Sequence, residues 1–191
     1  MHTQDFIQQY RNETTHRVIG LMSGTSLDGI DAVLVSIVTN AEQQVTSVVL
    51  EDQVSIPYSD EAKNLVKKLC VKGSSDAEDL CIAHAGLAHW NAEAVNRLIE
   101  HSHVARSSIA AVGMHGQTVW HAPVAQHFPG PNGPLQVTGT LQISNPHVVS
   151  AMTGLRVISD FRSADMAVGG EGAPLAPYID HLLFAEKGMG V

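Results

Sequence analysis

The first third of the chain has the hydrophobic pattern of a β-meander. Arg17–Met22 is a short apolar run, and Ile30–Val38 is a second one that follows a stretch of small, turn-forming residues. Residues Val45–Ile56 alternate between apolar and polar side chains, which predicts a third strand. Two β-rich runs joined by an Asp-Gly turn predict a hairpin, and we expect the third strand to lie beside it.

Helical periodicity follows the three strands. Ser59 is a predicted N-cap, and the acidic residues behind it favour a helix over Ala62–Cys70. Ser75 and Glu78 have the spacing of a capping box, which predicts a long helix that ends near His101. Residues that recur at helical intervals predict one buried face on this helix: Leu80, His84, Leu87, Ala94 and Leu98.

Short apolar runs alternate with helix signals in the second half of the chain. Asn145-Pro146 starts a predicted helix that Gly154 ends, and Pro174–Phe184 predicts a closing helix. The segment Phe128–Gly139 is rich in Pro and Gly and is expected to be an exposed loop. Three runs predict short buried strands: Ile109–Gly113, Leu141–Ile143 and Arg156–Asp160. Together these elements predict an α/β fold with a mixed sheet flanked by helices.

Composition narrows the class of protein. The chain has 191 residues, of which 44% are apolar and 16% charged, so it can bury a sizeable core. Its net charge of -8 argues against a nucleic-acid binder or a protein that lies on anionic membranes. The charge does not argue against ATP, since a few backbone N–H groups and one magnesium ion suffice to hold the phosphates.

The chain's ends and its cysteines suggest where it works. Residues 1–16 are mostly polar and lack the apolar run of a secretion signal, and no stretch approaches the length of a membrane span. Cys70 and Cys81 have neither the number nor the spacing of a disulfide framework or a zinc site. We expect both thiols to be buried and inert, and the protein to be reduced and cytoplasmic.

Residues that can bind phosphate fill the turn between the first two strands. Gly24 and Gly29 are expected to allow tight backbone curvature, so that successive N–H groups converge on phosphate oxygens. Asp28 and Asp31 accept hydrogen bonds only, so they would interact with a polyphosphate through Mg²⁺ and its water ligands. Three hydroxyl donors accompany them: Ser23, Thr25 and Ser26.

This turn differs from two well-known phosphate loops. No Lys follows it, as one would in a Walker loop, and no helix follows it, as in the dinucleotide fingerprint. Phosphate held by a β-hairpin is instead the mode of actin-like ATPases and sugar kinases. The alternative from the residues alone is an ordinary Gly/Ser/Asp turn between strands.

The full wording of the hairpin and of three later segments carries a family resemblance. Gly20–Leu34 (GLMSGTSLDGIDAVL) resembles the opening motif of the anhydro-N-acetylmuramic acid kinase family. The later segments agree with the family in the same order, so that the resemblance covers nearly all of residues 17–184: Gly113–His121 (GMHGQTVWH), Thr140–Pro146 (TLQISNP), and Asp160–Arg162 followed by Gly169–Pro177 (GGEGAPLAP).

The resemblance implies a fold and an activity. The fold is actin-like (ribonuclease H-like), with two lobes and with ATP and sugar in the cleft between them. Residues 17–191 would be the N-terminal lobe behind a polar extension, residues 1–16, and the second lobe would be absent from this chain. The enzymes use ATP and Mg²⁺ to cleave the 1,6-anhydro ring of anhydro-N-acetylmuramic acid and phosphorylate O6, for cell-wall recycling. The full-length protein would be a homodimer, with no nucleic-acid or membrane partner.

The resemblance also implies which residues form the site. Asp28 would hold the metal through a water molecule. The sugar side would be lined by His115, Gln117, Thr118, Asp160 and Arg162. The ATP contacts would come from the hairpin residues Gly24, Thr25, Ser26, Leu27, Asp28, Gly29, Ile30 and Asp31.

Chemistry alone leaves the sugar side open. His115 follows a buried strand, at the end of a sheet where ligands bind, and Gln117 and Thr118 can bond sugar hydroxyls. Arg162 can pair with a carboxylate such as the lactyl group of muramic acid. Alternatively, His115 caps the strand, and Arg162 forms a salt bridge with Asp160 or Asp165.

Several positions depart from the family pattern. Glu171 stands where the family usually has Gln, and Ser144 replaces a common Gly. The family's catalytic aspartate, in a Phe-Asp-Cys-Gly-Pro context, would lie beyond Val191, and the ending Gly188–Val191 resembles an interruption. We therefore expect no catalytic base in this chain and no activity from it alone. The alternatives are a kinase of another anhydrosugar, such as levoglucosan, and a non-catalytic truncated lobe.

Overall fold

The structure is a computed structural model that describes residues 3–177 and 179–180. These residues form two compact units. The first consists of residues 3–119 and 142–159, and the second of residues 120–141, 160–177 and 179–180. No helix of the described residues is both long and apolar enough to cross a membrane.

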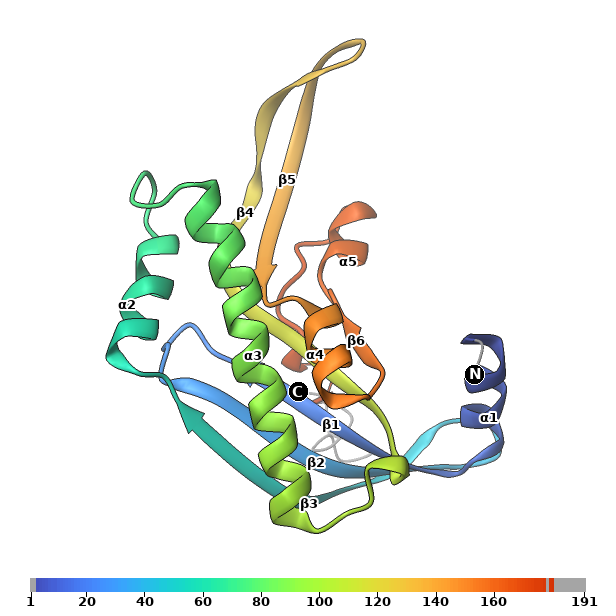
Figure 1. Ribbon diagram of the computed structural model, residues 1–191. Helices are drawn as coiled ribbons and strands as arrows, with labels where there is room; N and C mark the ends of the chain where they lie inside the picture. The colour runs from blue at the N-terminus through green and yellow to red at the C-terminus, as the bar shows by residue number, and fades with distance from the viewer. Residues whose placement is uncertain (1–2, 178, 181–191) are drawn as a thin grey trace. The chain divides into compact units, whose positions relative to one another are not determined.

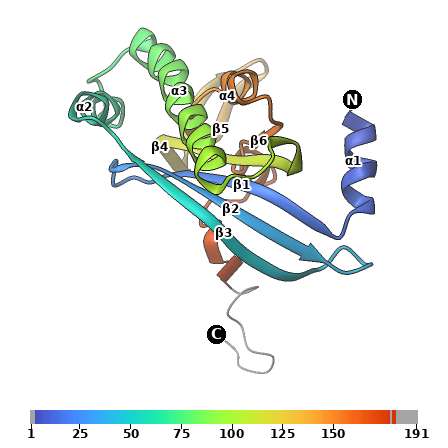
Figure 2. The same ribbon diagram turned by 60° about the horizontal axis from the view of Figure 1, so that its bottom comes forward.

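The first unit is built on the predicted meander. Strands β1 (Thr15–Ser23), β2 (Gly29–Thr39) and β3 (Val45–Pro57) pair antiparallel in sequence order, as Figures 1 and 2 show. Strand β1 also pairs parallel with β4 (Ile109–Gly130), and β4 pairs parallel with β6 (Val157–Ser159). The sheet is therefore mixed, with β1 between an antiparallel and a parallel neighbour, and the predicted fold class is confirmed.

Helices cover one face of this sheet. Helix α3 (Ala77–Ser102) crosses β1, β2 and β3, and α2 (Asp60–Leu69) lies beside its first half (Figures 1 and 2). A one-turn helix, η1 (Arg106–Ser108), leads into β4, and α4 (Pro146–Thr153) packs against α3. The predicted start and stop of α4 are confirmed, because the Asn145 side chain caps it and Gly154, at φ 70°, ends it.

Local capping explains where α2 and α3 begin. The hydroxyl of Ser59 accepts a hydrogen bond from the Ala62 N–H, as predicted for an N-cap. The capping box of α3 is formed by Asp76 and Asp79, one residue later than predicted from Ser75 and Glu78. A carboxylate serves at the third helical position as Glu does in the usual box, and the Asp79 carboxylate also pairs with Lys68 at 2.7 Å.

The core lies between the sheet and α3. Ile19 of β1 is opposite Leu34 of β2 and Val112 of β4, and all three side chains are at most 1% exposed. Val95 and Leu98 of α3 are fully buried. Burial of each such side chain stabilises the fold by about 1.5–3 kcal/mol relative to its exposure. The cluster therefore favours the strand register in which Ile19 lies between Leu34 and Val112.

The N-terminal residues form an element that the sequence did not predict. Helix α1 (Thr3–Asn12) precedes β1 and lies at the start of that strand in Figure 2. The ring of Tyr10 stacks on that of His16 at 3.7 Å, and the Arg156 guanidinium lies 4.3 Å from the centre of the Phe6 ring. The expected polar extension is thus a helix that uses its aromatic residues to contact the sheet.

One expectation about the second unit needs correction. The segment expected to be a loop, Phe128–Gly139, belongs to strands β4 and β5 (Gly133–Ile143), which form a long hairpin with its turn at residues 131–132. The short strand predicted over Ile109–Gly113 is the beginning of β4, and the one predicted over Leu141–Ile143 is the end of β5. Pro and Gly here occupy strand positions at an exposed sheet edge, where a missing N–H is tolerated.

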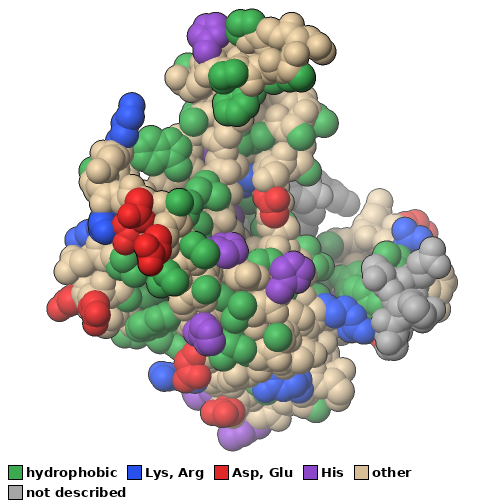
Figure 3. Space-filling view, turned by 45° about the horizontal axis from the view of Figure 1, so that its top comes forward, with side chains coloured by type: hydrophobic (Ala, Val, Ile, Leu, Met, Phe, Trp, Pro, Cys, Tyr) green, Lys and Arg blue, Asp and Glu red, His purple; other side chains and the backbone are tan. Residues whose placement is uncertain are grey.

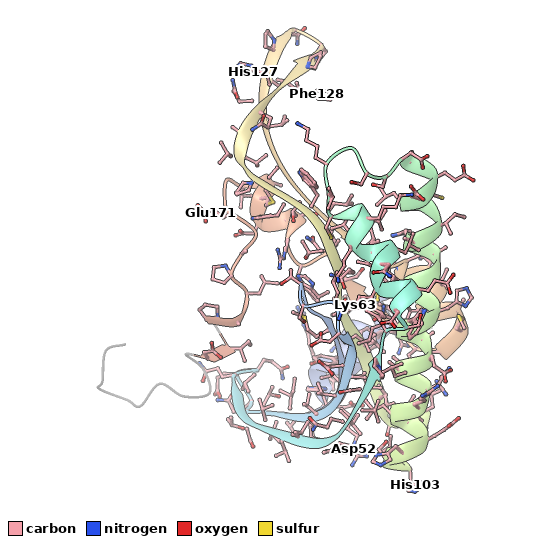
Figure 4. The ribbon with its side chains drawn as sticks, turned by 90° about the vertical axis from the view of Figure 1, so that its left-hand side faces the viewer. Asp52, Lys63, His103, His127, Phe128 and Glu171 are labelled. Carbon is pink, nitrogen blue, oxygen red and sulfur yellow. The ribbon has the colours of Figure 1, made fainter. Side chains whose placement is uncertain are left out.

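The hairpin is exposed, as predicted. His127 and Phe128 lie near its tip in Figure 4, and the face of the hairpin seen in Figure 3 carries mainly hydrophobic and uncharged side chains together with histidine. A short helix, α5 (Ser163–Ala167), follows in the same unit. The predicted helix over Pro174–Phe184 falls partly outside the described residues, and residues 176–177 and 179–180 of it are helical.

The cysteine prediction was wrong. Cys70, at the end of α2, and Cys81, on the first half of α3, are both exposed free thiols. Of their apolar neighbours in sequence, Leu69 and Ala83 are buried, whereas Val71 and Ile82 are exposed. Partial burial raises the pKa of the Cys70 thiol, which keeps it protonated at neutral pH.

Candidate functional site

The loop between β1 and β2 consists of residues 24–28 and is closed by its own hydrogen bond. The Leu27 N–H donates to the Gly24 carbonyl oxygen at 3.2 Å. Leu27 has a left-handed backbone, with φ 56°, yet its side chain is only 5% exposed and belongs to the core. A bulky residue adopts this conformation only where its surroundings enforce it, so Leu27 anchors the loop.

Gly24 in the loop and Gly29 at the start of β2 do not act as expected. Neither Gly24 nor Gly29 has a positive φ, so curvature does not require them. A Cβ atom at Gly29 would instead lie 2.2 Å from the carbonyl oxygen of Ile56 in β3. Gly29 is needed because β3 approaches the backbone of β2 closely at that point.

Asp28 is the anionic group of the loop. The Ser26 hydroxyl donates to its carboxylate at 2.5 Å, and its own carbonyl oxygen accepts from the Tyr58 N–H at 2.9 Å. The hydrogen bond from Ser26 lowers the pKa of Asp28, and the positive charge of Lys63, labelled on α2 in Figure 4, lowers it further. The carboxylate is therefore ionised at neutral pH, exposed, and available to a hydrated cation.

The remaining hairpin residues divide between ligand-facing and buried positions. Thr25 and Ser26 are exposed, and within the described residues their N–H groups form no hydrogen bond. Ile30 is fully buried in the core, so its side chain cannot contact a ligand. Asp31 is exposed and accepts a hydrogen bond at 2.5 Å from Ser55 on β3, its pairing partner across the strands.

Metal binding by protein groups alone is not supported. Among the described residues, no group of three or more His, Cys, Asp or Glu side chains could hold an ion. Asp28 offers one carboxylate and Ser26 one hydroxyl. This donor set suits Mg²⁺, which usually keeps several waters and binds through one or two carboxylates together with phosphate oxygens.

A bulge in β4 lies beside the loop. Leu21 of β1 pairs with Met114 of β4, but Ser23 pairs with Gln117, so β4 has one extra residue. Gly116 lies in this bulge with φ 77°, and a Cβ there would be 2.8 Å from the Ile143 carbonyl oxygen. Only glycine tolerates both the positive φ and the close approach of Ile143, which explains the glycine of the His-Gly-Gln-Thr motif.

The structure joins this motif to the loop through one side chain. Gln117 is 1% exposed, and its Nε2 donates to the carbonyl oxygen of Gly24, 93 positions earlier, at 3.3 Å. Nε2 also donates to the Thr118 carbonyl oxygen at 3.3 Å. On either side, the half-buried His115 ring lies 2.8 Å from the Gly116 carbonyl oxygen, and the Thr118 hydroxyl accepts from Gln142.

Asp160 and Arg162 belong to the second unit. Asp160, with φ 59°, accepts a hydrogen bond at 2.5 Å from the hydroxyl of Ser163, the first residue of α5. Arg162 is the residue before that helix. Asp165 accepts from the Gly172 N–H at 2.8 Å, and Gly170 lies so close to its carboxylate that a Cβ would overlap it. Gly170 and Gly172 therefore lie against the exposed Asp165 carboxylate, and Glu171 points outward in Figure 4.

Sequence reasoning missed three residues beside the loop. Tyr58 is 8% exposed, and its N–H fixes Asp28; burial raises the pKa of its phenol to about 12. Ser55 holds the Asp31 carboxylate, and Lys63 supplies positive charge near Asp28. A predicted register between β2 and β3 would have placed Ser55 opposite Asp31. No local sequence signal predicts that Tyr58 or Lys63 lies near the loop.

The fold is a mixed sheet flanked by helices, and the hairpin loop between β1 and β2 carries hydroxyl groups and a carboxylate. This architecture is consistent with the ATPase lobe of a sugar kinase. The comparison with known families defines the group. The model of the family described as anhydro-N-acetylmuramic acid kinase matches residues 16–190, and the chain belongs to that family.

Individual relatives agree with the family. The chain is 40% identical over 173 residues to an anhydro-N-acetylmuramic acid kinase of Shewanella loihica, which covers 91% of this chain and 42% of the relative. It is 37% identical over 180 residues to the enzyme of that name from Salinibacter ruber, covering 94% and 44%. A third, from Clostridioides difficile, is 36% identical over 170 residues, covering 88% and 42%. The chain thus spans less than half the length of these relatives.

Proposed function

We propose that these residues form the ATP-phosphate-binding part of a kinase acting on 1,6-anhydro-N-acetylmuramic acid. The whole reaction would cleave the anhydro ring and phosphorylate O6, giving N-acetylmuramate 6-phosphate for cell-wall recycling. Support comes from the family and from the names of relatives. The observation that carries the proposal is the ionised Asp28 carboxylate in a loop with exposed hydroxyls and unbonded N–H groups.

ATP would be held by the loop without a lysine. The N–H groups of Thr25 and Ser26 would donate to phosphate oxygens, and the Ser26 hydroxyl and Asp28 would bind Mg²⁺, in part through water. The ion, when bound, neutralises charge on the transferred phosphoryl group. Lys63 adds positive charge beside the same loop.

We infer that none of Asp28, Asp160 and Asp165 acts as a general base. Attack of water on the anomeric carbon needs a group that takes its proton, within hydrogen-bond reach. Asp28 would be occupied with the metal, the Asp160 carboxylate accepts the Ser163 hydroxyl, and the Asp165 carboxylate accepts the Gly172 N–H. We therefore propose that this polypeptide binds ATP but does not turn over, since loss of a base typically costs a factor of roughly 10²–10⁴.

The sugar would contact the residues after the β4 bulge and those before α5. His115 and Thr118 would bond hydroxyl groups, and Arg162 would pair with the lactyl carboxylate. A kinase of a carboxylate-free anhydrosugar such as levoglucosan is the second candidate, for which Arg162 would be of little use. Pairing of the full-length enzyme as a homodimer stays a prediction.

Calorimetric titration of the purified chain with Mg-ATP tests the proposal. We expect saturable binding by the wild type, and at least tenfold weaker binding by Asp28→Ala, with the same circular dichroism spectrum. The matched control is Asp60→Ala, which removes an exposed carboxylate from the first turn of α2. Equal affinities of Asp28→Ala and the wild type would contradict the role of Asp28 in Mg-ATP binding. Sugar phosphorylation by the chain alone would show that the general base lies within it.

A further inference from the structure

Gln117 connects two strands that carry different parts of the candidate site. Its side chain leaves β4 directly after the bulge and donates to the Gly24 carbonyl oxygen at the start of the β1–β2 loop. The same oxygen accepts the Leu27 N–H that closes the loop. One carbonyl group therefore receives both the loop's own hydrogen bond and the only described one that reaches it from another strand.

The geometry fixes the orientation of this amide. Both acceptors near it are carbonyl oxygens, those of Gly24 and Thr118, so the NH₂ group must face them. The other amide atom, Oε1, is buried and, among the described residues, has no hydrogen-bond partner. A buried acceptor without a partner costs stability, so an apolar side chain of similar size would suit the core better.

The surroundings also prevent Gln117 from binding sugar. The side chain is 1% exposed, and both of its donor hydrogens already have acceptors. A ligand hydroxyl could reach Oε1 only if the strands moved apart. The bulge at Gly116 turns Gln117 inward, toward the loop, whereas Thr118 is half buried.

We propose that Gln117 is a positioning residue: it sets the backbone conformation in which the Thr25 and Ser26 N–H groups meet the ATP phosphates. This role rests on the proposed function and replaces the sugar contact expected from the motif. A buried polar side chain that lowers stability yet fixes a ligand loop is the trade-off found at functional sites.

Substitution by residues of graded size and polarity tests the proposal. Gln117→Met keeps the length and removes the donor, and Gln117→Asn keeps the amide but falls one methylene short of Gly24. The control is Gln142→Met, which removes a neighbouring glutamine that donates to the Thr118 hydroxyl. For each variant, amide hydrogen exchange of residues 24–28, thermal unfolding and Mg-ATP affinity are measured.

The expected pattern separates positioning from support of the fold. Gln117→Met and Gln117→Asn should exchange the loop amides about five- to tenfold faster than the wild type and bind Mg-ATP weaker by a similar factor. The unfolding temperature of Gln117→Met should be equal to or higher than that of the wild type. Gln142→Met should change neither loop exchange nor ATP affinity.

Two results would overturn the role of Gln117. Loop exchange within twofold of the wild type would show that the bond to Gly24 does not hold the loop. A lower unfolding temperature with faster exchange throughout the sheet would make Gln117 a structural residue. Because exchange is measured without ligand, it decides the matter even if the wild type fails to bind ATP, a failure that would count against the proposed function alone.

Discussion

The Asn91 side chain, in the middle of α3, donates a hydrogen bond to the Ser144 hydroxyl at the end of β5, with 3.0 Å between nitrogen and oxygen. Both residues are buried, and the His84 ring accepts from the Ser144 N–H. Ser144 has φ 126°, in a region that glycine alone adopts without strain. The hydroxyl at this position, where the resembling family commonly has Gly, thus compensates in part for a strained backbone.

Two substitutions at Ser144 should separate strain from hydrogen bonding. Ser144→Ala loses the bond to Asn91 and keeps the strain, so its free energy of unfolding should fall by about 1–2 kcal/mol. Ser144→Gly loses the same bond but relieves the backbone, and should be more stable than Ser144→Ala by about 1–2 kcal/mol. Urea unfolding of the three proteins measures this, and equal stability of the two variants would show that φ at Ser144 carries no strain.

Gly116 and Gly73 form a matched pair for testing the β4 bulge. Both have φ 77°, but a Cβ at Gly73 would have no atom within 4 Å, whereas one at Gly116 would lie 2.8 Å from the Ile143 carbonyl oxygen. Gly73→Ala should cost about 1 kcal/mol, the usual penalty of a left-handed alanine. Gly116→Ala should cost about 3 kcal/mol, because the backbone must also shift. Similar losses of unfolding free energy in both variants would mean that the β5 backbone at Ile143 can shift at little cost to make room for the added methyl group.

Tyr58 predicts how stability depends on pH in the alkaline range. Burial raises the pKa of its phenol from 10.0 to about 12, so the neutral form is favoured by folding. The stabilisation is complete below pH 10 and is lost as the pH rises toward 12. Tyr58→Phe keeps the ring and its edge contact with Trp90. It should therefore gain about 1–2 kcal/mol over the wild type between pH 9 and pH 11.5, measured by urea unfolding. A constant difference across this range would show that Tyr58 is accessible to water when folded.

Arg162 separates the two candidate sugars. If it meets the lactyl carboxylate, Arg162→Ala should weaken binding of anhydro-N-acetylmuramic acid by about 2–4 kcal/mol and leave binding of levoglucosan nearly unchanged. Ligand titrations followed by nuclear magnetic resonance provide the measurement. Arg97→Ala, which breaks an exposed pair with Glu93, controls for loss of charge. Equal losses for both sugars would assign Arg162 a contact other than the carboxylate.

Local signals were read correctly where the cause is local. Ser59 and Asn145 cap helices through their own side chains, and two apolar runs, an Asp-Gly turn and the alternation in Val45–Ile56 sufficed to predict the meander. The hairpin tip near Phe128 was misread because Pro and Gly are ambiguous between loops and exposed strand edges. The packing of Gly29 under Ile56 and the reach of Gln117 to Gly24 depend on residues distant in sequence, so spacing could not reveal them.

The contact between Gln117 and Gly24 also sets an order of events in folding. As the chain is synthesised, β1, β2 and β3 exist long before β4, because 93 positions separate the two residues. The meander can pair as soon as it emerges, since its contacts are local, whereas the parallel pairing of β4 with β1 requires closure of a long loop. We therefore expect the three strands of the meander to pair before the hydrogen bond from Gln117 can hold the β1–β2 loop.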